Sequence, residues 1–187
     1  MTKRGNTETK ILEIGLALIQ ERGINGFSFA DIAERIGIKK ASIHYYFPTK
    51  LDLVKGVLAY YKHNFFVSLN AICHDKETLK EILLAYGNLY KSNLQENNWV
   101  CLCSMLATES FSLDKELKEG VNDFFMQNIQ WIEEKMKIFG MEDVVAEERA
   151  NQLFVVIQGI QIMTQSLEDV TYFEKIYTQE IEELTFF

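Results

Sequence analysis

Hydrophobic residues in the first part of the chain recur at intervals of three and four, the spacing of one face of an amphipathic helix. This pattern predicts a helix from about Glu8 to Arg22, whose buried face would consist of Ile11, Leu12, Gly15, Leu18 and Ile19. Gly23 and Gly26 then interrupt the pattern. We therefore expect one amphipathic helix followed by a turn that contains glycine.

The run from Phe27 to Lys50 predicts two short helices joined by a tight turn. Ser28 and Asp31 have the spacing of a capping box, which satisfies free backbone N–H groups at a helix start. Gly37 ends this helix, because glycine adopts the left-handed conformation at little cost. A second helix follows at 39–46. Two helices joined in this way form a helix-turn-helix motif, whose second helix enters the major groove of DNA.

Pro48, the only proline, stops the second helix because it has no backbone N–H. Thr49 and Asp52 form another capping box, and the helix that they start can extend to about Ala71, roughly 34 Å. Further helices are predicted at about 76–95, 99–110, 114–138, 143–167 and 171–185. No alternating run indicates a strand. The predicted fold class is all-α, with an N-terminal three-helix helix-turn-helix domain and a C-terminal helical bundle.

Composition narrows the class of protein further. The 187 residues are 48% hydrophobic, enough for a substantial core. No stretch of about 18 apolar residues indicates a membrane span, and the polar first ten residues do not resemble a signal peptide. Three cysteines do not make a disulfide framework. We expect a cytoplasmic protein that makes no use of a membrane.

The charge is divided unevenly along the chain. Residues 1–63 carry ten Lys and Arg against six Asp and Glu, a net charge of +4. Residues 64–187 carry nine against 21, a net charge of −12, so the whole chain has −8. A basic segment that coincides with a helix-turn-helix is the electrostatic pattern of a DNA-binding head on an acidic body. The acidic excess also favours solubility, and both interpretations can hold.

The second helix of the motif carries residue types suited to DNA. Ala41 and Ser42 are small and allow close approach, while lysines around the helix can bind phosphates. Consecutive aromatic residues with polar tips follow, and these cannot all be core on one helix. The predicted DNA-binding residues are Ser28, Phe29, Lys39, Lys40, Ala41, Ser42, His44, Tyr45, Tyr46 and Lys50. The alternative for a bare motif of this kind is a small helical bundle with a solvated basic face.

The segment from about Thr9 to Val54 resembles the DNA-binding domain of the TetR (tetracycline repressor) family of bacterial regulators. The residues that carry the resemblance are Ile11-Leu12, Gly23, Phe27-Ser28-Phe29, Ile32-Ala33, Gly37, Lys40-Ala41-Ser42-Ile43, Tyr45, Phe47 and Lys50-Leu51-Asp52-Leu53. One position departs from the family pattern. The family usually places histidine third in the aromatic run before Phe, and this chain places it first, at His44.

This resemblance implies a homodimeric transcriptional regulator, most simply a repressor, with three parts. They are a DNA-binding head at 1–48, a connecting helix at 49–72, and a domain at 73–187 for effector binding and dimerisation. A small apolar or aromatic effector would tilt the connecting helix and release a pseudo-palindromic operator. Two alternatives stay open: a DNA binder of the same fold without an effector, and a helical enzyme. No nucleophile with a base, phosphate loop or metal cluster supports an enzyme, and no cofactor is expected.

Members of the family commonly bind a small molecule within the C-terminal bundle. The candidate ligand residues here are large apolar and amphipathic side chains with one glutamine, namely Phe65, Tyr86, Tyr90, Trp99, Met105, Phe111, Phe125, Trp131, Phe154, Gln158 and Met163. Gln158 stands out because a polar side chain in an apolar helix needs a partner. The alternative is plain core for the aromatic residues, and a bond across a dimer seam for Gln158.

Cys101 matches a position that serves some members of the family as a sensor of oxidants or electrophiles. A cysteine in the first turn of a helix has its thiolate stabilised by the helix dipole. The alternative is a buried structural cysteine. A metal site is not expected, because Cys101 and Cys103 point to different sides of a helix.

Two apolar stripes mark the last two predicted helices. In the family, these two helices of each subunit pair across a two-fold axis into a four-helix bundle. The resemblance therefore implies a dimer surface made of Ala150, Leu153, Ile157, Ile160, Phe173, Ile176, Tyr177 and Ile181. The alternative is that both stripes pack on the core of their own subunit.

Overall fold

The computed structural model describes residues 3–109 and 113–185, and all regular structure in these ranges is helical. A short 3-10 turn, η1 (Ile24–Gly26), accompanies the α-helices. These are α1 (Lys3–Arg22), α2 (Phe29–Ile36), α3 (Lys40–Tyr46), α4 (Lys50–Cys73), α5 (Leu79–Asn97), α6 (Leu102–Thr108), α7 (Lys115–Ile138), α8 (Asp143–Leu167) and α9 (Val170–Leu184). The predicted all-α class, with a helix-turn-helix head and a helical body, is confirmed.

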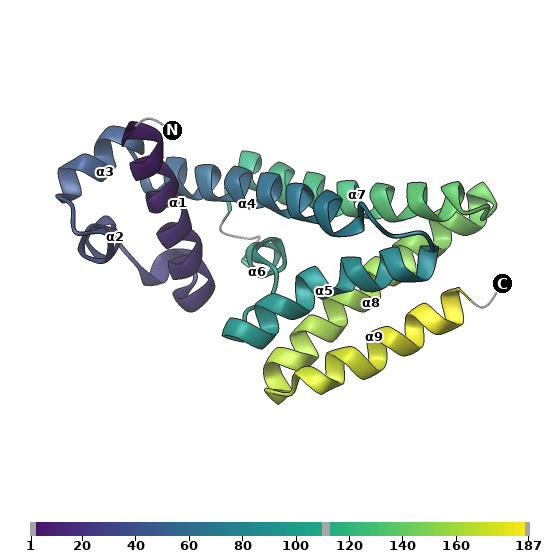
Figure 1. Cartoon of the computed structure of the whole chain (residues 1–187). Helices are drawn as coiled ribbons and strands as arrows, with labels where there is room; N and C mark the ends of the chain where they lie inside the picture. The colour runs from purple at the N-terminus through teal and green to yellow at the C-terminus, as the bar shows by residue number, and fades with distance from the viewer. Residues whose placement is uncertain (1–2, 110–112, 186–187) are drawn as a thin grey trace.

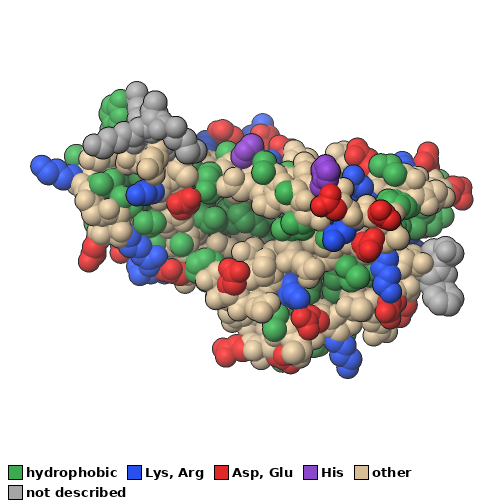
Figure 2. Space-filling model, viewed as in Figure 1, with side chains coloured by type: hydrophobic (Ala, Val, Ile, Leu, Met, Phe, Trp, Pro, Cys, Tyr) green, Lys and Arg blue, Asp and Glu red, His purple; other side chains and the backbone are tan. Residues whose placement is uncertain are grey.

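Helices α1 to α3 form the head at one end of the molecule (Figure 1). From it, α4 and α7 run side by side, and α5, α8 and α9 pack beneath them to complete the body. Figure 2 shows Lys and Arg side chains on the outer surface of the head. None of the helices within the described residues is long and apolar enough to cross a membrane.

Local hydrogen bonds explain where the helices of the head start and end. The Ser28 hydroxyl accepts from the backbone N–H of Ala30 at 3.2 Å, and Asp31 accepts from the backbone N–H of Ser28 at 2.8 Å. Gly37 ends α2 with φ of 77°, in the left-handed region. Thr49 and Asp52 cap α4 in the same way as Ser28 and Asp31 cap α2. The capping predictions are therefore confirmed.

Close helix contacts fix how the body is assembled. At Gly87 of α5, a Cβ atom would lie 2.0 Å from the ring of Tyr177 on α9, so only glycine allows this approach. The Tyr177 hydroxyl donates to the carbonyl oxygen of Leu83 at 2.6 Å. Helix α8 packs between α7 and α9. Asn98 and Glu168, with φ of 56° and 53°, end α5 and α8 in the left-handed conformation.

The helix predicted at 99–110 is shorter than expected. Asn98 turns the chain away from helical geometry, and the next three residues run without regular structure to the start of α6 at Leu102. Side chains of distant helices bind the backbone here instead. Gln20 donates to the carbonyl oxygen of Val100 at 3.2 Å, and Gln161 accepts from the N–H of Cys101 at 2.8 Å. The predicted end at residue 110 lies outside the described residues.

Candidate nucleic-acid interface and the core of the body

The recognition helix α3 is anchored on one side and exposed on the other. Ile43 is fully buried, and Phe47, just after the helix, is 7% exposed. The opposite side is open to solvent over Lys39, Lys40, Ala41, Ser42, His44 and Tyr45, while Tyr46 is half-buried. Ser28, at the start of α2, is also exposed. The structure thus brings most of the predicted DNA-binding residues onto the free surface of the head.

Phe29 is a correction to the predicted DNA contacts. Its side chain is only 6% exposed and packs edge-on against the ring of His44, with centroids 4.7 Å apart. His44 Nδ1 donates to the carbonyl oxygen of Pro48 at 3.2 Å. Phe29 therefore belongs to the core of the head. The displaced histidine of the recognition helix is tied to the turn that follows it.

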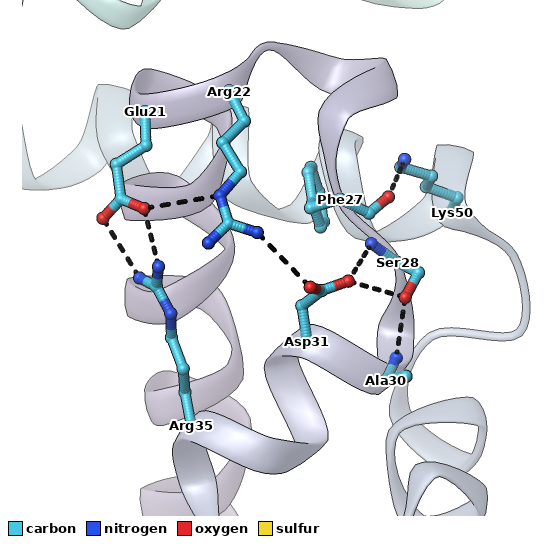
Figure 3. A network of polar contacts seen from close by, with 8 residues as sticks. All are labelled: Glu21, Arg22, Phe27, Ser28, Ala30, Asp31, Arg35 and Lys50. Atoms are coloured by element: carbon cyan, nitrogen blue, oxygen red, sulfur yellow. Dashed lines mark hydrogen bonds and ion pairs between the residues drawn. The ribbon is translucent and has the colours of Figure 1, made fainter.

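Lys50 also departs from its predicted role as a phosphate anchor. Its ammonium donates to the carbonyl oxygen of Phe27 and lies 4.3 Å from the centroid of the Phe27 ring (Figure 3). Burial lowers the pKa of Lys50. Because this ammonium already holds two parts of the head together, it is a structural residue. Lys39 and Lys40 remain as exposed lysines of the predicted set.

A charged network ties α1 to α2 (Figure 3). Arg35 donates to both carboxylate oxygens of Glu21, at 3.1 and 2.6 Å, and Arg22 donates to Asp31 at 3.3 Å. Hydrogen bonding from Arg35 lowers the pKa of Glu21, and hydrogen bonds from Ser28 lower the pKa of Asp31. These contacts hold the angle between the first two helices, and sequence reasoning did not identify the Glu21–Arg35 pair because it joins different helices.

The exposed side of α3 has the properties of a surface that reads DNA. Small side chains at Ala41 and Ser42 leave the helix start accessible, and lysines precede them. Tyr45 is 66% exposed and meets the Tyr46 ring edge-on, with centroids 5.3 Å apart. A short helix with such a surface can place side chains against base edges while lysines bind phosphates.

The predicted ligand residues of the body are mostly packed against one another. Tyr86 and Tyr90 are buried, and Phe65 and Phe154 are nearly so. Phe65 meets Tyr90 with centroids 5.3 Å apart, Tyr86 stacks on Trp131 at 5.3 Å, and Phe125 meets Phe154 at 5.5 Å. Trp99, Met105, Phe125 and Trp131 are half-buried. Met163 is 47% exposed and lies apart, and Phe111 lies outside the described residues.

Four surface hollows formed by described residues measure about 550, 450, 380 and 280 Å³, and none is lined by a predicted ligand residue. In the structure, the predicted aromatic set forms packed core instead of the walls of these hollows. This arrangement corresponds to the alternative interpretation of that set.

Asn128 organises the middle of this core and was missed by sequence reasoning. It is fully buried, and its Oδ1 accepts from the hydroxyls of Tyr86 at 2.9 Å and Tyr90 at 3.0 Å. Its Nδ2 donates to the carbonyl oxygen of Phe124 at 2.7 Å. The available signal was its spacing, because Asn128 stands four residues from both Phe124 and Ile132 on the apolar side of α7.

A second polar cluster joins α4, α6 and α8. The Tyr61 hydroxyl donates to Cys101 Sγ at 3.3 Å, and Gln161 holds the Cys101 N–H. Gln158 accepts from the Ser104 hydroxyl and from Gln161 Nε2, while its own Nε2 is buried and has no partner among the described residues. Gln158 thus faces α6 of its own subunit. The role of its neighbour Gln161 was not predicted.

Cys101 stands at the start of α6 as its N-cap residue and is 1% exposed. Burial raises the pKa of its thiol, but hydrogen bonds to the sulfur from Cys103, Tyr61 and Ser104 outweigh burial and place the pKa at about 7. Burial raises the pKa of the Cys103 thiol, and its hydrogen bond to the Cys101 sulfur raises that pKa further. The described residues contain no group of three or more His, Cys, Asp or Glu side chains placed to hold a metal.

The predicted dimer surface requires correction. Ile157 and Ile181 are fully buried within one subunit, as are Ala150 and Leu153, while Ile160, Phe173 and Tyr177 are at most 5% exposed. Only Ile176 is half-buried. These side chains are covered because α8 packs between α7 and α9 and α9 packs on α5. Within one subunit the stripes, Ile176 apart, form part of its core.

A different side of α8 carries exposed apolar residues. Val155 is 68%, Ile162 is 53% and Met163 is 47% exposed. Gly159, between them at helical spacing, has open space where a side chain would stand. We call these four residues the outer α8 face. Exposed apolar residues that share one helix side are typical of an interaction surface.

A helix-turn-helix head with an exposed recognition helix, mounted on a helical body, defines a DNA-binding regulator. Residues 11–57 match the family model described as bacterial regulatory proteins, tetR family. The head of this chain therefore matches the DNA-binding domain of the TetR family, and the whole chain is similar to transcriptional regulators of that family. The proteins of this family that the chain resembles are described as transcriptional regulators.

Whole-chain comparisons support the same family. A TetR transcriptional regulator from Legionella pneumophila is 29% identical, with a TM-score of 0.87 over 94% of this chain and 95% of that one. A transcriptional regulator from Saccharomonospora viridis, solved in complex with choline, is 26% identical, with a TM-score of 0.83 over 95% and 96%. The uncharacterised HTH-type transcriptional regulator YuxN of Bacillus subtilis is 24% identical over 159 residues, 82% of this chain. The chain spans about half the length (52%) of that curated relative.

Proposed function

We propose that this chain is a homodimeric, ligand-responsive repressor that binds a pseudo-palindromic DNA operator. The observation that carries the proposal is the exposed side of α3, where Lys39, Lys40, Ala41, Ser42 and Tyr45 are all accessible. A recognition helix in the major groove would use the lysines for phosphates, and Ser42, Tyr45 and His44 for base edges. Residues 1–48 would form the head, 49–72 the connection, and 73–187 the domain for effector and partner subunit.

The outer α8 face supports the dimeric part of this proposal. Two heads must be held about 34–36 Å apart to bind successive turns of the major groove. Pairing of two outer α8 faces would cover the exposed Val155 and Ile162 side chains and use the open space at Gly159 for close approach. This assignment replaces the buried stripes as the proposed dimer surface.

Regulation would reach the head through α4. Helix α4 packs against α1 at one end and against α5 and α7 of the body along its length. A ligand that binds one arrangement of the body more tightly would favour one tilt of α4, and so one separation of the two heads. The relative from Saccharomonospora viridis was solved in complex with choline, which supports a small-molecule ligand for this chain as well.

Selection of operator DNA from a random pool tests the proposal. The purified protein should enrich one two-fold symmetric sequence, with half-sites about ten base pairs apart. Enrichment of no sequence above the level of non-specific binding would refute a sequence-specific regulator. A parallel selection with Lys40→Ala, and with Lys115→Ala as a control on the body, separates a head-dependent result from general charge effects.

A second candidate function, oxidant sensing, is favoured by the surroundings of Cys101. A pKa of about 7 makes much of the sulfur thiolate at neutral pH, and the thiolate is the nucleophile. Attack on a peroxide forms an S–O bond and breaks the O–O bond, which yields a sulfenic acid and releases the other oxygen as hydroxide or alkoxide. The added oxygen would disturb the bond from Tyr61, a residue of α4.

The two buried cysteines of α6 provide a matched test of this second function. Operator binding is measured with and without hydrogen peroxide for Cys101→Ser and Cys103→Ser. Loss of the oxidant response in Cys101→Ser alone supports sensing by Cys101. An oxidant response that persists in Cys101→Ser refutes it.

A further inference from the structure

The largest of the four hollows lies at the end of the body far from the head. It measures about 550 Å³ and is bounded by the start of α5, the end of α7, the start of α8 and the end of α9. Figure 1 shows these helix ends gathered opposite α3. We call this space the distal hollow. Its volume falls within the range of about 300–1,000 Å³ that is usual for small-molecule sites.

The lining of the distal hollow indicates the chemistry of a ligand. Met136 and Leu184 are 0% and 2% exposed and form its floor, and Met141 and Val145 are half-buried in its walls. Methionine side chains adapt their shape to an apolar partner. Thr78, Lys80, Glu142 and Thr185 also line the space; Lys80 lies 3.5 Å from Glu182, and the Thr185 hydroxyl donates to the carbonyl oxygen of Ile181 at 2.7 Å. An apolar floor with a few polar groups suits a small, mainly apolar molecule with one polar end.

Helix α7 connects the distal hollow to the DNA-proximal part of α4. Met136 and Phe139, at its end, line the hollow. At its start, Lys55 of α4 forms ion pairs with Asp114 and Glu116. The 24 residues of α7 span about 36 Å as one uninterrupted helix. A shift at the hollow can therefore move the partner of α4 near the head, because a helix transmits displacement along its axis.

From this geometry we propose that the distal hollow is the effector site, and that it binds a small apolar molecule with one polar end. This inference rests on the proposed function, a ligand-responsive regulator. It places the ligand in the distal hollow, because the aromatic residues predicted to bind it are packed against one another. The site lies about the length of α7 from the head and acts through that helix.

Two adjacent valines of α8 allow a matched test. Val145 lines the hollow, whereas Val144 is 61% exposed and does not. Binding of the fluorescent dye anilinonaphthalene sulfonate, an apolar molecule with one charged end, is titrated against wild type, Val145→Trp and Val144→Trp. Filling the hollow should weaken dye affinity at least about tenfold relative to Val144→Trp. Equal affinities in the two variants would overturn the inference.

A second pair of variants tests the same inference independently of Val145→Trp. Circular dichroism checks that each variant is folded. Met141→Lys places a charge in the wall, and Ile138→Lys places the same charge on a residue that is 70% exposed and outside the lining. Dye affinity should fall in Met141→Lys alone. Binding of selected operator DNA by the wild type is measured in parallel. Its absence refutes the proposed function, whereas unchanged dye binding in both hollow variants refutes only the site.

Discussion

Lys55 of α4 lies 3.1 Å from the carboxylate of Asp114, the residue whose side chain caps the first turn of α7. The same carboxyl group accepts from the backbone N–H of Leu117 at 2.8 Å. One side chain thus starts α7 and ties it to α4. Since α7 continues to the distal hollow, this contact is the point at which a displacement of α7 would reach the head-proximal end of α4.

The two roles of Asp114 can be separated by substitution. Asp114→Asn keeps a capping oxygen but removes the charge that pairs with Lys55, whereas Asp114→Ala removes both. We expect a lower urea midpoint for both variants, with the larger decrease in Asp114→Ala. Equal decreases would show that the cap adds nothing beyond the ion pair.

The same carboxylate gives a pH dependence of known sign. Hydrogen bonding from Leu117 and Lys55 lowers the pKa of Asp114 below its ordinary value of 3.8. Its contribution to stability is therefore complete above the unfolded pKa and is lost as the pH falls through the lowered folded pKa. The difference in unfolding free energy between wild type and Asp114→Asn should persist at about pH 5 to 7 and shrink in acid below about pH 4. A difference that grows in acid would contradict this assignment.

Removal of the buried amide at Asn128 should destabilise the core. Asn128→Leu leaves the hydroxyls of Tyr86 and Tyr90 without their shared acceptor, at a cost of about 2–3 kcal/mol. In a background where both tyrosines are phenylalanine, the same substitution should cost much less, because no hydroxyl is left unpaired. Chemical unfolding of the four proteins measures this coupling, and an identical cost in both backgrounds would argue against it.

The contact at Gly87 gives a prediction about packing. Gly87→Ala places a methyl group against the Tyr177 ring and should cost about 1–3 kcal/mol of unfolding free energy. Asn88→Ala serves as the control, because Asn88 is the exposed neighbour of Gly87 on the same helix and alanine favours a helix. Thermal or urea unfolding should separate the two variants, and a neutral Gly87→Ala would contradict the close approach of α5 and α9.

Tyr61 should control the reactivity of Cys101. The thiolate fraction, and with it the rate of oxidation by hydrogen peroxide, should rise with pH through about 7. Tyr61→Phe removes one hydrogen bond that stabilises the thiolate, so the midpoint should move to higher pH. Sulfenic acid formation followed by mass spectrometry measures both profiles. An unmoved midpoint would show that Tyr61 does not tune this thiol.

The outer α8 face predicts which substitutions prevent dimer formation. Val155→Arg introduces a buried charge if two such faces pair, and should yield a monomer in light scattering. Ile138→Arg, at an exposed position near the end of α7, should leave the dimer intact. A dimeric Val155→Arg protein would require another surface for subunit pairing.

Local features of the fold were predictable because the residues that make them are adjacent in sequence. Ser28 with Asp31, and Thr49 with Asp52, cap their helices as expected. The start of α6 was not predictable, since it depends on Gln20 and Gln161 from other helices. The surroundings of Lys50 were missed for the same reason, because its partner is the carbonyl group of Phe27.

The site assignments show a second limit of sequence reasoning. An apolar stripe predicts that a helix side is buried, but not which helix covers it. For this reason Ile157 and Ile181 suggested a dimer surface and instead lie inside one subunit. Aromatic residues such as Tyr86 and Trp131 likewise suggested a pocket. They stack on each other instead, and this contact depends on how α5 and α7 pack together, which the sequence of either helix alone does not reveal.

The salt dependence of operator binding tests DNA recognition by α3 most directly. Affinity for a selected operator is measured over a series of salt concentrations for wild type, Lys40→Ala and Lys115→Ala. Lys40→Ala should weaken binding and reduce the slope of log affinity against log salt by about one for each phosphate that the lysine neutralises. Lys115→Ala, on the body, should change neither. Equal affinities and equal slopes for Lys40→Ala and wild type would contradict the account.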